Sequence, residues 1–218
     1  MPLVYREKLK GLYVITDSKL TPYKEGKIYE MVESALRGGA KIVQLRDKET
    51  PLKELFQVAL ELKKLCQKYG ALFIINDYIE LAKETQADGV HIGKEDPSLE
   101  LALRELPGKI IGVSCYGDLK RALLAEKIGA SYVAFGSFYS SPTKPNAPII
   151  PLEIIVEAKR LLNIPVCAIG GITLEKAEEL IKLGADMVAI ISDIWKAISI
   201  EERAKAYKHL FEKALLRT

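Results

Sequence analysis

Eight short apolar segments, each followed by a longer segment with helical periodicity, alternate along the whole sequence. The short segments are rich in Val and Ile and are apolar on both faces, which is typical of parallel strands covered on both sides. No Ser/Gly-rich linker interrupts the alternation. We therefore predict an α/β fold on a parallel sheet. The predicted strands span residues 11–17, 41–47, 71–77, 89–93, 109–115, 132–138, 165–171 and 187–192.

The longer segments carry apolar residues at spacings of three and four, as amphipathic helices packed on a sheet do. In the segment 52–69, Leu55, Val58, Leu62 and Leu65 follow this spacing, with lysines between them. Several segments end in glycine, which readily closes a helix in the left-handed conformation. The predicted helices span residues 28–37, 52–69, 78–85, 98–106, 119–128, 152–162, 174–183 and 200–216.

Eight β/α units of about 27 residues each predict a closed (β/α)8 barrel, the TIM barrel. A length of 218 residues suits one such barrel, so we expect a single domain over residues 1–218. An open doubly wound sheet is the competing topology. The number of units favours the barrel, because eight strands close one.

Charge and composition restrict the possible partners. The chain has 32 Lys and Arg against 29 Asp and Glu, a net charge of +3 with no basic cluster, so we expect neither nucleic acid nor a membrane as partner. The N-terminal segment is charged at Arg6, Glu7, Lys8 and Lys10, unlike a secretory signal. Three widely spaced cysteines fit reduced thiols. We expect a cytoplasmic protein, and the sequence leaves its oligomeric state open.

The second predicted strand ends in polar residues at a spacing of two. Gln44, Arg46 and Lys48 can therefore point the same way, toward the carboxyl ends of the strands, where barrels of this class place their active sites. Two cations and an amide at one place suit phosphate or pyrophosphate. The alternative is a rim of salt bridges with Asp47 and Glu49.

Carboxylates follow the next two strands. The third ends in Asn76 and Asp77, and the fourth leads to Asp96. Facing an anion-binding mouth, these carboxylates suggest Mg²⁺ held together with substrate phosphate oxygens. No cluster of His and Cys suggests zinc. The alternative is that Asp77 and Asp96 cap the helices that follow them.

Two further loops read as phosphate-binding segments. The loop 136–148 is long and carries Ser141, Thr143 and Lys144, which suggests a lid or phosphate clamp, although a merely solvated loop remains possible. Strand seven ends at Gly171 and strand eight at residues 191–192. Loops in these places, with a short extra helix, bind phosphate through backbone amides in this class of barrel.

The histidine His91 and the single tryptophan are predicted to have structural roles. His91 lies within a strand between Val90 and Ile92, and we interpret it as a hydrogen-bonded core residue. Trp195, the single tryptophan, is predicted to pack under the last connection. No Ser/His/Asp or Cys/His arrangement emerges.

Nearly the whole chain resembles the thiamine phosphate synthase family. The resemblance implies a TIM barrel that joins hydroxymethylpyrimidine diphosphate to hydroxyethylthiazole phosphate, giving thiamine monophosphate and pyrophosphate with Mg²⁺. In that family the chemistry is dissociative, so no strong general base is needed. The ordered motifs that carry the resemblance are YVITD, VQLRDK, IINDYIELA, DGVHIGKED, GVSCY, YVAFGSFYSSPTK, IPVCAIGGIT and GADMVAIIS.

The resemblance also implies roles for individual residues. Asp77 and Asp96 would hold Mg²⁺, and the thiazole phosphate would bind chiefly to the backbone at Gly171, Ile191 and Ser192. Three of the residues assigned to pyrophosphate and pyrimidine are expected to act in catalysis: Lys144, Arg46 and Ser114. Lys144 is expected to stabilise the negative charge on the departing pyrophosphate. The full set assigned to pyrophosphate and pyrimidine is Gln44, Arg46, Lys48, Asn76, Ser114, Ser141, Thr143 and Lys144.

The sequence departs from the family pattern at three positions. Lys94 stands where Gln is usual, Tyr116 where His is usual, and Ser141 where Thr is usual. The sister family of thiazole tautomerases, related to the regulator TenI, lacks the second metal carboxylate and uses a histidine after strand five. Asp96 and Tyr116 favour the synthase, while the tautomerase and a non-catalytic binding regulator remain alternatives.

Overall fold

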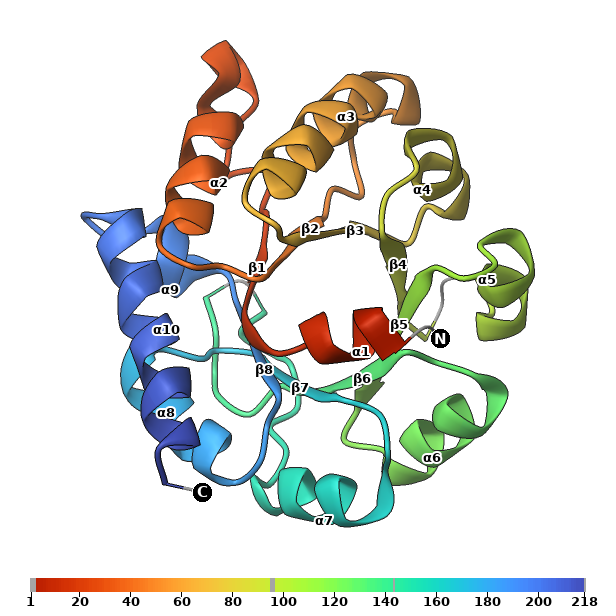
Figure 1. Ribbon diagram of the computed structural model, residues 1–218, viewed down its shortest axis with the longest axis vertical. Coiled ribbons are helices and arrows are strands. Elements are labelled where there is room, and N and C mark those ends of the chain that lie inside the picture. The colour runs from red at the N-terminus through yellow and green to blue at the C-terminus, as the bar shows by residue number, and fades with distance from the viewer. Residues whose placement is uncertain (1–2, 95–96, 143, 218) are drawn as a thin grey trace.

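A closed barrel of eight parallel strands forms the centre of the molecule (Figure 1). This computed structural model describes residues 3–94, 97–142 and 144–217. All eight predicted strands are present, and β1 pairs with β8 in the register Gly11↔Met187, which excludes the open sheet. The strands are β1 (Gly11–Ile15), β2 (Ile42–Leu45), β3 (Leu72–Asn76), β4 (Gly89–Ile92), β5 (Ile110–Tyr116), β6 (Tyr132–Phe135), β7 (Val166–Ile169) and β8 (Met187–Ile190).

The predicted helices surround the barrel as an outer layer (Figure 1). Their apolar faces pack against the outer faces of the strands and form one core. In α3 (Leu52–Lys68), for example, Leu55, Val58 and Leu62 are buried, as their spacing predicts. The other outer helices are α2 (Lys27–Arg37), α4 (Ile79–Thr85), α5 (Leu99–Glu105), α6 (Leu119–Ile128), α7 (Glu153–Leu161), α8 (Leu174–Lys182) and α10 (Ile200–Leu215).

Three short elements add to the predicted pattern. The helix α1 (Leu3–Lys8) lies across the end of the barrel that faces the viewer in Figure 1. It precedes β1, so it covers the amino ends of the strands. Six residues are too few to show a helical period, which explains why it was not predicted. A 3-10 turn, η1 (Lys24–Gly26), precedes α2. The expected extra helix after strand eight is α9 (Ser192–Trp195).

A second core fills the barrel itself. Leu9, which follows α1, is buried beneath the barrel, and Tyr5 packs against the same cluster. The interior is therefore closed at the amino ends and accessible from the carboxyl ends. The residues of this inner core are Leu9, Tyr13, Ile15, Ile42, Leu72, Ile74, Ile110, Tyr132, Ala134, Cys167, Met187 and Ala189.

Two other expectations from composition can be compared with the structure. Cys66, Cys115 and Cys167 are buried free thiols, as predicted. Within the described ranges, no helix combines the length and the apolar character that crossing a bilayer requires.

Candidate active site

A cavity of about 900 Å³ opens at the carboxyl ends of the strands. It brings together every predicted site residue that the structure describes, from six of the eight strands or the connections after them. Asp96 and Thr143, which were also predicted, lie outside the described residues. The predicted residues that line the cavity are Gln44, Arg46, Lys48, Asn76, Asp77, Ser114, Ser141, Lys144, Gly171, Ile191 and Ser192.

Three of the predicted cations line this cavity near one another. Arg46 and Lys48 reach it from the end of β2, and Lys144 reaches it from the loop between β6 and α7. Partial removal from water lowers the pKa of Lys144, and the nearby charges of Arg46 and Lys48 lower it further. The three cations are thus close enough to repel one another, and a multiply charged anion would relieve that repulsion.

Asp47 does not form the salt-bridged rim that was the alternative for this cluster. Its carboxylate accepts hydrogen bonds from the hydroxyls of Tyr23 at 2.6 Å and Thr50 at 2.7 Å, and from the amides of Glu49 and Thr50. Burial opposes its ionisation, but these hydrogen bonds lower the pKa of Asp47. Asp47 therefore organises the β2–α3 turn. Lys48 approaches Asp77 instead, with Nζ 3.6 Å from Oδ2.

Asp77 faces the cavity from the end of β3. Its φ is +67°, a left-handed conformation that Asp tolerates better than most residues. The N-cap residue of α4 is Tyr78, so Asp77 does not occupy the capping position that was its alternative role. The neighbouring Asn76 is also buried and lines the cavity.

Oxygen ligands of this kind suit Mg²⁺, which binds proteins through one or two carboxylates and takes its other ligands from water and substrate phosphate. Among the residues with a described position, no three His, Cys, Asp or Glu side chains form a metal-binding group. Asp77 is the described carboxylate that fits, because it is nearly buried and opens into the anion-binding cavity. The donor set therefore suits a hard cation bound together with a phosphorylated substrate.

The loop between β6 and α7 is fixed to the barrel at several points. The Tyr139 amide donates to the Gly170 carbonyl at 3.1 Å, and the Ile150 amide donates to the Ser137 carbonyl at 2.9 Å. Lys176 Nζ lies 4.5 Å from the centre of the Tyr139 ring. Ser141 and Lys144 thereby line the cavity. Lys144 is itself exposed, so the role of this loop as a lid or phosphate clamp stays a prediction.

Glycines let the end of β7 approach that loop closely. Gly171 has a φ of +66°, and a Cβ atom there would lie 2.5 Å from the Tyr139 carbonyl oxygen and 2.6 Å from that of Ser140. Any side chain would force the two connections apart. Gly171 also lines the cavity, and without a side chain its backbone can be approached closely by a ligand.

A partly buried network supports the last part of the site, and sequence reasoning did not find it. The Asp193 carboxylate in α9 accepts hydrogen bonds from the Leu174 amide at 3.1 Å, from Arg203 at 2.8 Å and from the Tyr207 hydroxyl. Trp195 Nε1 donates to the Ile15 carbonyl at 2.7 Å, which confirms its packing role under this connection. These contacts join α8, α9, α10 and β1 beneath Ile191 and Ser192.

Hydrogen-bonded side chains from the barrel interior also line the cavity, and here too the prediction from sequence was incomplete. His91 is a hydrogen-bonded core residue, as predicted, but it also lines the cavity. Its ring nitrogens contact Tyr132 and Ser114, and Tyr132 in turn contacts Tyr13. Neither tyrosine was singled out. Their inward positions on β1 and β6 follow from the alternation of strand side chains, but their partners come from distant strands.

Tyr116 replaces the histidine of the sister family and has a different task. It follows a register shift between β5 and β6 and has a φ of +56°. Its hydroxyl accepts a hydrogen bond from the Lys94 amide at 3.1 Å. The side chain, 45% exposed, therefore ties the β4 connection to β5 at the mouth of the cavity.

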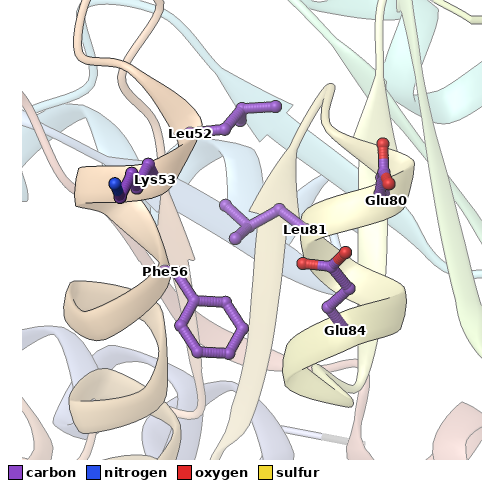
Figure 2. A pocket seen from close by; sticks show the side chains of 6 residues that line it. All are labelled: Leu52, Lys53, Phe56, Glu80, Leu81 and Glu84. Atoms are coloured by element: carbon purple, nitrogen blue, oxygen red, sulfur yellow. The ribbon is translucent and has the colours of Figure 1, made fainter.

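A second hollow, of about 440 Å³, lies on the outer surface between α3 and α4. Figure 2 shows that Phe56 of α3 and Leu81 of α4 reach into it, and that Glu80 and Glu84 come from the α4 side. It does not include any of the predicted site residues. Of the two, the cavity at the carboxyl ends carries the concentration of cations, amides and hydroxyls.

Comparisons with known proteins agree with this geometry. A sequence profile of the family described as thiamine monophosphate synthase matches residues 12–194. The thiamine-phosphate synthase of Thioalkalivibrio sulfidiphilus is 44% identical over 208 residues, which cover 94% of this chain and 97% of that protein. That of Aromatoleum aromaticum is 44% identical over 207 residues, covering 94% and 98%.

Solved structures show the same relationship. Thiamine phosphate pyrophosphorylase from Pyrococcus furiosus superposes with a TM-score of 0.88 at 38% identity, covering 97% of this chain and 99% of that one. A 3-hexulose-6-phosphate synthase shares only the fold, with a TM-score of 0.69 at 17% identity over 92% of this chain and 99% of the other. The profile match and the nearly full-length identities place this chain in the thiamine monophosphate synthase family.

Proposed function

We propose that this protein is a thiamine-phosphate synthase, a transferase that joins hydroxymethylpyrimidine diphosphate to hydroxyethylthiazole phosphate. The products are thiamine monophosphate and pyrophosphate. One observation carries the proposal: a single cavity is lined by the cations Arg46, Lys48 and Lys144 and also by the connections after β7 and β8, at Gly171, Ile191 and Ser192. Two phosphorylated substrates need two such anion sites within one reaction space.

The reaction proceeds by loss of pyrophosphate. The C–O bond between the pyrimidine methylene and the diphosphate breaks, and its electron pair leaves on pyrophosphate. The thiazole nitrogen then donates its lone pair to the methylene cation and forms the new C–N bond. Negative charge develops on the leaving group. Each preorganised hydrogen-bond donor at that place therefore lowers the activation free energy by about 3 to 4 kcal/mol.

The residues of the chain divide between the two substrates. Lys144, Arg46 and Lys48 stabilise the departing pyrophosphate, and Ser114 offers it a hydroxyl. Gln44 and Asn76 bind the pyrimidine end, together with Ser141 and Thr143 of the β6–α7 loop. Gly171, Ile191 and Ser192 hold the thiazole phosphate. No step requires a strong base, which agrees with a cavity whose only described histidine already engages Tyr132 and Ser114.

Asp77 and Asp96 would hold Mg²⁺ together with oxygens of the diphosphate. When bound, the ion supplies positive charge that neutralises the leaving group. This assignment of Asp77 is supported by its position in the cavity lining and by its ion pair with Lys48. We assign the protein to the cytoplasm, because its buried free thiols suit a reducing compartment.

The test is an assay of pyrophosphate release by the purified protein with Mg²⁺, run with and without the thiazole phosphate. We expect release to depend on the thiazole phosphate and to match the formation of thiamine monophosphate. Conversion between thiazole tautomers without coupling would identify a tautomerase. Binding of thiamine monophosphate with neither activity would identify a regulator.

A further inference from the structure

A chain of hydrogen bonds crosses the interior of the barrel from β2 to β5. Gln44 Nε2 donates to the Tyr13 hydroxyl at 2.8 Å, and the hydroxyls of Tyr13 and Tyr132 lie 2.7 Å apart. The Tyr132 hydroxyl is 2.8 Å from His91 Nδ1, and His91 Nε2 is 2.7 Å from Ser114 Oγ. Five side chains from five strands are thus linked end to end.

The chemistry of the first link sets the direction of the whole chain. An amide nitrogen can only donate, so the Tyr13 oxygen accepts from Gln44. Among the described side chains, the only other hydrogen-bond partner of the Tyr13 hydroxyl is Tyr132, so the Tyr13 proton goes there. The Tyr132 proton then goes to His91 Nδ1. A neutral imidazole that accepts at Nδ1 carries its proton on Nε2 and donates it to Ser114.

The direction of this chain determines where the Ser114 hydroxyl can donate its proton. Because its oxygen accepts from His91, its own proton remains for a group in the cavity, which Ser114 lines. On the basis of the proposed synthase reaction, we infer that Tyr13 and Tyr132 are positioning residues that hold His91 in the Nε2–H tautomer and so make Ser114 a donor to the leaving pyrophosphate.

The packing of the two tyrosines keeps this direction fixed. Both are almost completely buried, and burial raises the pKa of both phenols, so they remain protonated donors. The Tyr132 ring stacks on His91, with centroids 5.6 Å apart. It also occupies space that a glycine leaves on β5, because a Cβ atom at Gly112 would lie 2.1 Å from Tyr132 Cζ. The chain therefore has little freedom to rearrange.

Removal of single hydroxyl groups tests the inference with the rings left in place. Tyr132→Phe breaks the link to His91, so we expect kcat for coupling to fall about tenfold or more, with the KM for the pyrimidine diphosphate changed less than about threefold. Tyr13→Phe acts one link further away and should lower kcat less. Ser131→Ala is the matched control, since it removes a buried hydroxyl that contacts the Ile111 amide and lies outside the cavity.

A double-mutant cycle separates positioning from general loss of packing. If Tyr132 acts through Ser114, adding Tyr132→Phe to Ser114→Ala should lower kcat no further. Additive losses, an unchanged kcat in Tyr132→Phe, or a loss no larger than that of Ser131→Ala would overturn the inference.

The tautomer of His91 can be measured without substrate. The sequence contains two histidines, and His209 is exposed on α10, so ¹⁵N imidazole spectra of the whole protein distinguish them. We expect His91 to show the Nε2–H tautomer in the wild type and a mixture in Tyr132→Phe. The Nδ1–H tautomer in the wild type would refute the inference even if the variants failed to fold. Absence of synthase activity in a wild type with the expected tautomer would instead refute the proposed function.

Discussion

Lys144 shows at the scale of one residue how a binding site stores unfavourable energy. Its pKa is lowered by desolvation and by the charges of Arg46 and Lys48, so the protonated form is less stable here than in water. The folded pKa lies below the unfolded value, so this cost is present while the group is charged and disappears as pH rises through the folded pKa. At neutral pH the protein keeps the cost, and in the proposed reaction a bound pyrophosphate would offset it.

Lys144→Met should therefore separate activity from stability. We expect kcat to fall at least tenfold, equivalent to about 1.4 kcal/mol of transition-state stabilisation. The free energy of unfolding should stay equal or rise slightly, because a repulsive charge is removed. Steady-state kinetics and thermal unfolding measure both. Lys53→Met on the outer face of α3 is the control, and equal kinetic effects in the two variants would exclude the proposed role of Lys144.

Asp77 is the second residue whose charge can be isolated. Asp77→Asn keeps the shape of the side chain and removes its negative charge, so we expect coupling to slow at least tenfold and to need more Mg²⁺ for half-maximal rate. Titration of the activity with Mg²⁺ provides the measurement. Glu49→Gln, an exposed change on the same rim, should leave both quantities unaltered. Normal turnover in Asp77→Asn would remove it from the metal site.

At the scale of elements, the proposed thiazole phosphate site at Gly171, Ile191 and Ser192 depends on the contact between two connections. The β6–α7 loop and the end of β7 meet at Gly171, and the network around Asp193 fixes α9 beside them. The strand ends therefore supply the backbone amides, while the surrounding helices hold those amides in place.

Gly171→Ala tests this contact. The residue has a left-handed φ, which costs a non-glycine residue about 1 to 2 kcal/mol, and its Cβ would also collide with the Tyr139 carbonyl. We expect a clear loss of thermal stability and a higher KM for the thiazole phosphate. Gly70→Ala is a close control, because Gly70 has a φ of +68° but nothing lies within 4 Å of the added Cβ. It should lose some stability and keep wild-type kinetics.

At the scale of the whole molecule, the features that recur in every β/α unit of the barrel could be predicted from the sequence. Eight strands and eight outer helices follow from periodicity, and the cavity residues follow because parallel strands bring their carboxyl ends to one place. The helix α1 escaped prediction because six residues show no period. Tyr13 and Tyr132 escaped because they are 119 positions apart and meet only once the barrel closes. Asp193 escaped for a similar reason, since its partners lie on α8 and α10.

The two ends of the barrel divide stability from activity. The proposed catalytic residues line the cavity at the carboxyl ends, while Leu9 and α1 seal the amino ends with apolar contacts. Leu9 is only 1% exposed, so Leu9→Ala removes buried methyl groups and leaves a space among the inner core residues. Such a change costs about 2 to 5 kcal/mol in typical cores, which lowers Tm by roughly 5 to 15 °C in a chain of this size.

Leu9→Ala should nevertheless keep kcat and both KM values close to wild type at 25 °C, because the cavity lies at the opposite end of the strands. Calorimetry and the coupled assay on the same preparation measure the two effects. Ile198→Ala, at a fully exposed position, should change neither. If Leu9→Ala lost activity in proportion to its stability while still folded at the assay temperature, the two ends of the barrel would be coupled, and packing at the amino ends would have to count as part of the active site.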